Sequence, residues 1–167
     1  VDQIAEVNPN AFLILTGGEP LLRPDIYELI RYAADKKFMV VLGTNGTLIN
    51  EANAKKIKAA GAHGVGISID SMDATKHNKF RGVTGAWEHS MEAFNVLNEV
   101  GVDFLIQMSV SDMNYREIPE VVAFTEKIGA IAFNLYFLVC TGRGQGNTDI
   151  SNEAYEEALK MLYEQQM

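Results

Sequence analysis

The sequence predicts an α/β fold in which parallel strands alternate with helices, and two observations support this prediction. Five short apolar runs rich in branched residues recur along the 167-residue chain, and each is followed by a longer segment whose apolar residues have helical spacing. The apolar runs are nearly continuous, which is typical of strands covered on both faces. Parallel strands joined by helical crossovers form an open sheet or a barrel, and in both architectures ligands bind at the carboxyl ends of the strands.

The strands are expected at the apolar runs, which cover residues 11–15, 38–43, 65–69, 104–110 and 132–139. The first clear helix is expected to begin near Pro24 and Asp25, because proline suits the first helical turn and aspartate favours the positive end of a helix. One apolar stripe follows, at Ile26, Leu29, Ile30 and Ala33. This stripe predicts that the helix packs on the sheet.

The next helices are expected to end at Gly61, Gly101 and Gly129, because glycine readily adopts the left-handed conformation that terminates many helices. The helix expected over residues 86–100 carries a second apolar stripe, at Trp87, Met91, Phe94 and Leu97. We interpret this stripe as core packing.

The ends of the chain and the lack of linkers bear on its domain organisation. A last helix is expected over residues 152–166, after a loop at 141–151. No Pro/Ser linker, low-complexity tract or strict repeat interrupts the units, so a single domain over residues 1–167 is predicted. The first residues resemble the tail of a helix and run directly into a strand, so the chain is expected to begin in mid-domain.

The composition excludes several classes of partner. Fourteen Lys and Arg against 22 Asp and Glu give a net charge of -8, which repels phosphate backbones, so no nucleic-acid partner is expected. No apolar run approaches the roughly 20 residues that span a bilayer, so no membrane partner is expected either. Cys140 is the only cysteine, so an internal disulfide is impossible and the composition suits the reducing cytoplasm.

The first expected strand is followed by the motif Thr16-Gly17-Gly18-Glu19-Pro20. Two glycines let the backbone approach a ligand without obstruction by side chains, and proline ends the hydrogen-bonded ladder. The motif therefore predicts a recess of exposed backbone polar groups. Taken alone, it is also compatible with an ordinary turn.

Polar motifs also follow the next two strands: Gly43-Thr44-Asn45-Gly46-Thr47, and Ser68-Ile69-Asp70-Ser71 with Arg81-Gly82 about ten residues later. In their order and placement these motifs resemble the radical S-adenosylmethionine (radical SAM) superfamily, whose members have a GGEP-type motif after the second barrel strand, T-N-G after the third and S-x-D after the fourth. The resemblance extends from about Phe12 to Gly144. It implies a partial (β/α)6 TIM-like barrel, with five β/α units visible and the first unit missing.

The resemblance, carried over position by position, implies an S-adenosylmethionine site. The backbone of Gly17, Gly18 and Glu19 would hold the methionyl amino group of this cofactor. Ser68 and Arg81 would contact its carboxylate, which matches the fork of a guanidinium group. The alternative for Arg81 is a solvated surface charge.

The other candidate contacts also have alternatives. Thr44 and Asn45 would contact the cofactor from the T-N-G motif, although Asn-Gly is also the commonest tight-turn dipeptide. Asp70 would face the ribose or orient its loop, or it would cap the following turn. Gln107 and Ser109 alternate with apolar residues on the fourth expected strand and would point into a barrel lumen as cofactor contacts.

The last expected strand leads into Thr141-Gly142-Arg143-Gly144, which resembles the subgroup with a C-terminal auxiliary-cluster (SPASM-like) domain. That subgroup includes enzymes of modified-heme, alternative heme and pyrroloquinoline quinone biosynthesis. Cys140 would approach a substrate or an auxiliary cluster, or it is a small buried hydrophobe. His63, His77 and His89 lack metal-ligand spacing and are expected at the surface or as capping residues, so no metal ligand is expected in the chain.

The cysteines of the family's cluster are absent. The 4Fe-4S cluster of the family is held by three cysteines in a C-x-x-x-C-x-x-C loop, whereas this chain contains Cys140 alone. Truncation or degeneracy would explain this difference, and we favour truncation because the cluster loop would precede the helix whose tail begins this chain. Residues 1–167 are then a radical SAM core fragment without the cluster-binding N-terminal segment and any auxiliary domain.

The resemblance also implies a function. The intact enzyme would cleave S-adenosylmethionine to methionine and a 5'-deoxyadenosyl radical, for heme-type tetrapyrrole or other cofactor biosynthesis or for peptide modification. Its partners would be a small-molecule or peptide substrate and a ferredoxin- or flavodoxin-type electron donor. The fragment itself is expected to have no catalytic residue, to be inactive and to self-associate. The alternatives are a degenerate, non-catalytic barrel that binds S-adenosylmethionine, and an aldolase or isomerase with Glu19 as base and Thr141–Gly146 as a phosphate-binding nest.

Overall fold

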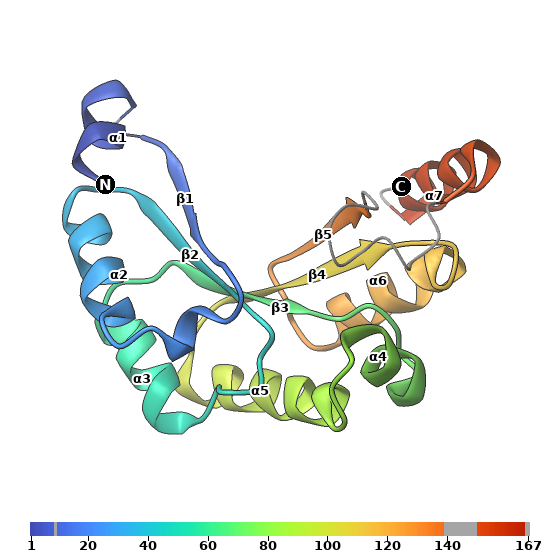
Figure 1. Cartoon of the computed structure of the whole chain (residues 1–167), viewed down its shortest axis with the longest axis horizontal. Helices are drawn as coiled ribbons and strands as arrows, with labels where there is room; N and C mark the ends of the chain where they lie inside the picture. The colour runs from blue at the N-terminus through green and yellow to red at the C-terminus, as the bar shows by residue number, and fades with distance from the viewer. Residues whose placement is uncertain (9, 139–149, 166–167) are drawn as a thin grey trace. The chain divides into compact units, whose positions relative to one another are not determined.

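The computed structural model describes residues 1–8, 10–138 and 150–165, and it shows the predicted alternation of strands and helices (Figure 1). The strands are β1 (Phe12–Leu15), β2 (Met39–Thr44), β3 (Gly64–Ser68), β4 (Phe104–Val110) and β5 (Ala132–Phe137). The α-helices are α1 (Asp2–Val7), α2 (Ile26–Asp35), α3 (Glu51–Ala59), α4 (Ala74–Arg81), α5 (Ala86–Val100), α6 (Ile118–Lys127) and α7 (Asn152–Gln165). Short 3-10 helices are η1 (Pro20–Leu22) and η2 (Tyr115–Glu117).

The described strands form one sheet in the order β1-β2-β3-β4-β5, which is also their order along the chain. β1 pairs parallel with β2, with Phe12 opposite Met39, and β2 pairs parallel with β3, with Val41 opposite Gly64. The carboxyl ends of β1 and β2 therefore lie side by side. The loops that leave these two ends carry the first two motifs.

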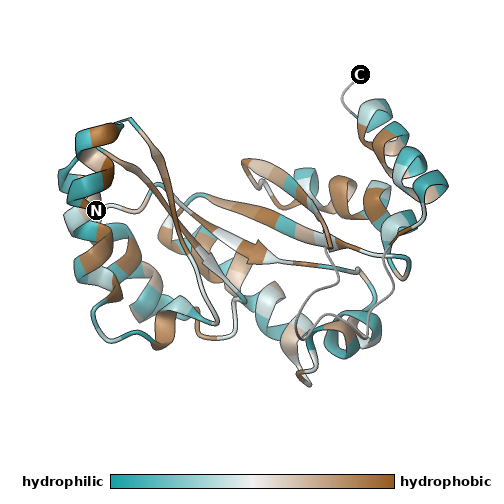
Figure 2. Ribbon diagram, turned by 45° about the horizontal axis from the view of Figure 1, so that its top comes forward, coloured by the Kyte–Doolittle hydropathy of each residue, from teal (hydrophilic) through white to brown (hydrophobic). Residues whose placement is uncertain are grey.

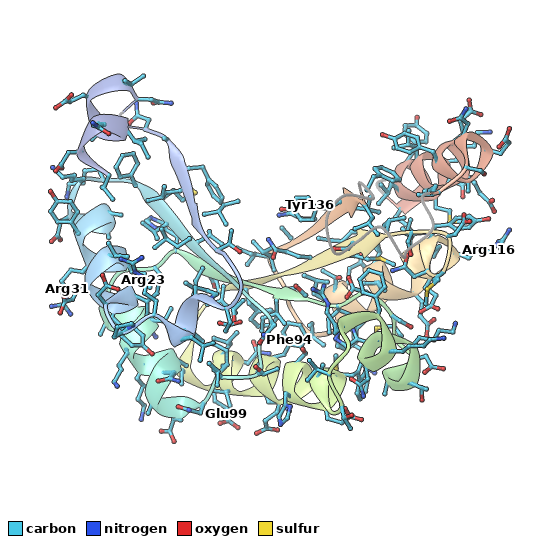
Figure 3. The ribbon with its side chains drawn as sticks, in the orientation of Figure 1. Arg23, Arg31, Phe94, Glu99, Arg116 and Tyr136 are labelled. Carbon is cyan, nitrogen blue, oxygen red and sulfur yellow. The ribbon has the colours of Figure 1, made fainter. Side chains whose placement is uncertain are left out.

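The chain divides into two compact units, one of residues 1–67 and 88–105 and one of residues 68–87 and 106–167. In the first unit, Phe94 of α5 is 2% exposed and its ring centroid lies 5.1 Å from that of Phe104 (Figure 3). In the second unit, the ring of Phe137 stacks on Tyr155 of α7 at 3.9 Å. That residues 1–167 form a single domain stays a prediction.

The apolar periods predicted for the helices are confirmed in part. Ile26, Ile30 and Ala33 of α2 are buried, as are Phe94 and Leu97 of α5. The other members of the two stripes, Leu29, Trp87 and Met91, are half-buried. Figure 2 shows hydrophobic residues running along the strands and alternating with hydrophilic ones on the helices. The expected helix-terminating glycines have positive φ angles of 88° at Gly61, 71° at Gly101 and 74° at Gly129.

The element boundaries differ from expectation by one or two residues. β3 ends at Ser68 rather than Ile69, although the Ile69 amide still donates to the Gln107 carbonyl at 2.9 Å. β5 ends at Phe137, and residue 139 of the expected strand lies outside the described residues. Helix α4 was not expected, because its sequence is almost entirely polar. Among the described residues, none of the helices has the length and apolar character that a membrane crossing requires.

Candidate functional site

The carboxylate of Glu19 connects the loop after β1 to the end of β2. Its Oε1 accepts hydrogen bonds from the Thr44 hydroxyl at 2.7 Å and from the Leu21 amide at 3.1 Å. Its Oε2 accepts one from the Asn45 amide at 2.9 Å. The acidic residue of the first motif therefore fixes the two neighbouring loops that would face a ligand.

The glycines of the first motif are exposed and are not required by packing. A Cβ atom built on Gly17 or Gly18 would meet no other atom within 4 Å. By contrast, a Cβ on Gly43 of β2 would lie 3.2 Å from the Thr16 hydroxyl oxygen, so this glycine is needed for close approach of two strands. The side of Gly17 and Gly18 on which a Cβ would stand is therefore open.

The second motif forms a tight turn. Oδ1 of Asn45 accepts hydrogen bonds from the Thr47 amide at 2.9 Å and the Thr47 hydroxyl at 2.7 Å. Gly46 has a φ of 81°, a conformation that favours glycine. Thr44 is only 4% exposed. The side chain of Asn45 therefore stabilises a tight turn, as one of the two interpretations predicted. Its backbone amide donates to Glu19.

Asp70, which follows β3, is the centre of a hydrogen-bond network in the second unit. It is 1% exposed, its Oδ1 accepts from the Ser109 amide at 2.9 Å, and its Oδ2 accepts from Nε of Arg81. Its own amide donates to Nδ1 of His77 at 3.2 Å. Of the alternatives for Asp70, capping of the following turn does not describe its carboxylate, which binds Ser109 and Arg81; the side chain of Asp73 caps α4.

Arg81 is the last residue of α4, and its side chain is 27% exposed. Its Nε pairs with Asp70, so the two terminal amino groups of the guanidinium are not needed for this ion pair. A partly buried ion pair differs from the solvated surface charge considered above. With Nε bound to Asp70, the two terminal amino groups of Arg81 form a planar pair of donors, which suits a carboxylate.

The polar residues expected on β3 and β4 are half-buried. Ser68 ends β3, and Gln107 and Ser109 alternate with buried neighbours along β4. Nε2 of Gln107 lies 3.5 Å from the hydroxyl of Tyr136 on β5, which Figure 3 labels. The alternation expected for β4 is therefore confirmed, whereas ligand contacts of these residues stay predictions.

Sequence reasoning missed two members of the Asp70 network. His77 was expected at the surface or as a cap, but it is 1% exposed and accepts from the Asp70 amide. Asn114, in the loop after β4, is 5% exposed and donates through Nδ2 to the carbonyl of Asp70 at 2.8 Å. Asp73 could have revealed helix α4, since aspartate is a favoured N-cap. His77 and Arg81 would then lie four residues apart on one helical face.

A second carboxylate stabilises the start of α4. Glu117 accepts hydrogen bonds from the Ser71 hydroxyl and the Met72 amide and pairs with Nζ of Lys76 at 2.6 Å. The hydrogen bond to Glu117 raises the pKa of Lys76. The loop between β3 and α4 is thus held from both sides, by Asp70 and by Glu117.

The expectations for the last motif lie outside the described residues. They concern Cys140, Thr141-Gly142-Arg143-Gly144 and the phosphate nest at Thr141–Gly146. Within residues 1–8, 10–138 and 150–165, no three His, Cys, Asp or Glu side chains gather in a cluster that could hold a metal ion.

Comparison with protein families gives a match to the radical SAM superfamily over residues 1–125. An AdoMet-dependent heme synthase of Methanosarcina barkeri is 40% identical over 166 residues, which are 99% of this chain and 47% of that protein. The AdoMet-dependent heme synthase of Nitratidesulfovibrio vulgaris is 42% identical over 166 residues, which are 98% of this chain and 45% of that protein. This chain thus spans about half the length of the curated relatives it matches.

Comparison with solved structures identifies the fold. The crystal structure of Streptococcus suis SuiB bound to S-adenosylmethionine has a TM-score of 0.77 at 19% identity, over 90% of this chain and 35% of SuiB. The structure of SuiB bound to the precursor peptide SuiA has a TM-score of 0.78 at 18% identity, over 98% of this chain and 38% of SuiB. The predicted α/β partial-barrel fold is confirmed by this likeness.

Proposed function

Because the chain belongs to the radical SAM superfamily, we propose that it binds S-adenosylmethionine and forms part of an enzyme of heme-type tetrapyrrole biosynthesis. The observation that carries this proposal is the identity of 40% and 42% with AdoMet-dependent heme synthases over nearly the whole chain. Peptide modification is the second candidate, since SuiB, crystallised with a precursor peptide, has the same fold. Peptide modification is the weaker candidate, because SuiB is only 18% identical to this chain.

We assign residues of two motifs to the amino acid part of S-adenosylmethionine. No neighbouring atom obstructs the side of Gly17 and Gly18 where a Cβ would stand, so their backbone groups, with that of Glu19, are assigned to the cofactor's amino group. Arg81 and Ser68 are assigned to its carboxylate, because a guanidinium and a hydroxyl both donate to a carboxylate.

The remaining candidates are given indirect or secondary roles. Thr44 and Asn45 hold Glu19 and thereby shape the first loop. Asp70 acts through Arg81, since both of its carboxylate oxygens are hydrogen-bonded within the chain. Gln107 and Ser109, half-buried on β4, are proposed as further cofactor contacts.

The cofactor would supply the reactive chemistry, and the chain would orient it. When bound and reduced by one electron, S-adenosylmethionine supplies hydrogen-atom abstraction from an unactivated carbon of the substrate. The residues assigned above would hold its amino and carboxylate groups and exclude water from the reacting atoms. None of them is assigned a catalytic role.

The residues present do not fit a 4Fe-4S cluster. Such a cluster needs several converging thiolates, and Cys140 is the only cysteine. We propose that the cluster ligands belong to another segment of a cytoplasmic enzyme, which a ferredoxin- or flavodoxin-type protein would reduce. The chain of 167 residues would then be inactive alone and prone to self-association.

The rival functions have less support. A base must accept a proton from a substrate, but the carboxylate of Glu19 already accepts three hydrogen bonds from Leu21, Thr44 and Asn45. This arrangement suits a structural role rather than aldolase or isomerase chemistry. A degenerate barrel would bind the same cofactor, so it differs from our proposal only in the chemistry of the whole protein.

Cofactor binding can be tested on the chain itself by nuclear magnetic resonance. The 15N-labelled chain would be titrated with S-adenosylmethionine and, separately, with 5'-methylthioadenosine, which lacks the amino acid part. We expect the amides of Gly17, Gly18 and Glu19 to shift with S-adenosylmethionine and to stay in place with methylthioadenosine. Unchanged amides at saturating S-adenosylmethionine would overturn the proposal.

A further inference from the structure

Every polar atom of Asp70 has a hydrogen-bond partner within the second unit. Its amide donates to His77, its carbonyl accepts from Asn114, and its two carboxylate oxygens accept from Ser109 and Arg81. At 1% exposure it has almost no contact with solvent. Buried networks of this kind rigidify a site when all their members are satisfied. Asp70 therefore has the properties of a support for other residues rather than those of a ligand contact.

Asn114 ties the ends of β3 and β4 together. Its Nδ2 donates to the carbonyl of Asp70 at 2.8 Å and to the carbonyl of Ser109 at 2.9 Å, while its Oδ1 accepts from the Ser111 amide at 2.8 Å. One side chain thus fixes the loop after β3 against the last residues of β4. The Ser109 amide donates to Oδ1 of Asp70, so Asn114 holds both residues of that hydrogen bond. Loss of Asn114 would therefore loosen Asp70 and Ser109 together.

His77 of α4 also binds Asp70. Its Nδ1 accepts from the Asp70 amide at 3.2 Å, and this contact fits the tautomer that carries its proton on Nε2. Nδ1 also lies 3.6 Å from Oδ2 of Asp70, the oxygen that binds Arg81. His77 and Arg81 are separated by one helical turn of α4 and both approach Asp70 from that helix.

We propose that His77 and Asn114 are positioning residues, which fix Asp70 and through it orient Arg81 toward the carboxylate of the bound cofactor. This inference rests on the proposed function for the identity of the ligand. Nε of Arg81 is held by a buried acceptor, so the direction of its terminal amino groups follows from the position of Asp70. Neither positioning residue needs to touch the ligand.

The test combines two readouts on the labelled chain. The first readout is taken by 15N nuclear magnetic resonance. It gives the protection of the Arg81 Nε proton from exchange with solvent and the tautomer of His77. The second is the ratio of dissociation constants for S-adenosylmethionine and decarboxylated S-adenosylmethionine, which reports on the carboxylate contact alone. The variants are Asn114→Ala, Asn114→Asp, His77→Phe and His77→Asn, of which His77→Asn keeps an acceptor close to the position of Nδ1.

Asn53→Ala is the matched control, because Nδ2 of Asn53 also binds a loop carbonyl, that of Leu48 at 2.8 Å, in the other unit. We expect the native chain to show His77 protonated on Nε2 and a protected Arg81 proton. Asn114→Ala and His77→Phe should lose that protection and about fivefold in affinity for S-adenosylmethionine, the effect of about one net hydrogen bond, with no change for the decarboxylated form. His77→Asn should restore part of the affinity, and Asn53→Ala should change neither readout.

Three results would overturn the inference: a proton on Nδ1 of His77 in the native chain, undiminished protection of Arg81 in folded Asn114 and His77 variants, or equal losses for both ligands. The tautomer needs no variant, so it decides the matter even where Asn114→Ala fails to fold. A native chain that binds neither ligand would instead refute the proposed function. The proton-exchange readout would still decide whether His77 and Asn114 position Arg81.

Discussion

Glu19 accepts a hydrogen bond from the hydroxyl of Thr44 at 2.7 Å, so the acidic residue of one strand-end motif holds the threonine of the next. The same carboxylate binds the amide of Asn45 at 2.9 Å. These contacts explain why the two motifs occur together. The loop after β2 thus supplies two of the three donors that bind the carboxylate of Glu19.

The first prediction follows from this contact. Glu19→Gln keeps the shape of the side chain but replaces one acceptor oxygen with a donor, which must then face the amide of Asn45 or the hydroxyl of Thr44. We expect the free energy of unfolding to fall by about 1–3 kcal/mol, the cost of leaving a partly buried polar group unsatisfied. Urea denaturation followed by circular dichroism would measure it. Glu99→Gln, on the exposed face of α5 (Figure 3), should change stability by less than about 0.5 kcal/mol.

The second prediction separates ligand binding from folding at two glycines. Gly18→Val should abolish binding of S-adenosylmethionine and leave the thermal midpoint nearly unchanged, because a Cβ at Gly18 meets no atom within 4 Å. Gly46→Val should lower the midpoint, since Gly46 has a φ of 81° and its Cβ would lie 3.2 Å from Ile67. Calorimetry and thermal denaturation of both variants would check the contrast. Unchanged affinity in Gly18→Val would show that the ligand does not contact this backbone.

The third prediction concerns Arg81. Replacement by alanine should cost about 1.5–3 kcal/mol of cofactor binding, or roughly 10- to 150-fold in affinity, because a charge-assisted contact is lost. It should also destabilise the fold, since the buried carboxylate of Asp70 loses its cation. Binding should therefore be measured where the variant remains folded. Arg31→Ala on α2 is the control, and a loss under about threefold for Arg81→Ala would show that Arg81 serves its ion pair with Asp70 and does not contact the ligand.

The sequence predicts the strands well because each is a short run of mostly apolar residues, and this pattern needs no knowledge of tertiary contacts. It also predicts the helix ends, since Gly61, Gly101 and Gly129 have the φ angles expected of them. Helix α4 was missed because its stability comes from the Asp73 cap and from contacts with Asp70 and Glu117 rather than from an apolar stripe.

The same reason explains what was missed at the site. Motif order identifies residues that follow strands, but it does not show which of them bind one another. His77 and Asn114 lie in polar segments without a motif, and their importance depends on a long-range contact with Asp70. An alternation of polar and apolar residues could predict the half-buried positions Gln107 and Ser109 of β4, because that signal is local.

The fourth prediction concerns the iron-sulfur cluster. Reconstitution of the chain with iron and sulfide should give no stable 4Fe-4S centre, because Cys140 can supply only one thiolate. The absorbance near the visible charge-transfer band and the electron paramagnetic resonance spectrum after reduction would show this. A stoichiometric, reducible 4Fe-4S signal that survives gel filtration would contradict the prediction. A chain extended by the upstream coding segment, treated in the same way, would show whether that segment brings the missing ligands.

The last prediction concerns self-association through β1. This strand stands at one end of the strand order, and its alternating residues Phe12 and Ile14 are 53% and 41% exposed, beside Met39 of β2 at 50%. Exposed apolar residues on a terminal strand favour pairing with another copy of the chain, because unpaired backbone groups and apolar surface are then both covered. We expect sedimentation velocity to show concentration-dependent dimers, and Ile14→Lys to shift the chain toward the monomer. Leu22→Lys, at a residue of η1 that is 73% exposed, is the control and should leave the equilibrium unchanged. A native chain that stays monomeric at high concentration would contradict the prediction, and equal effects of both lysines would point to a general effect of an added surface lysine rather than to the β1 surface.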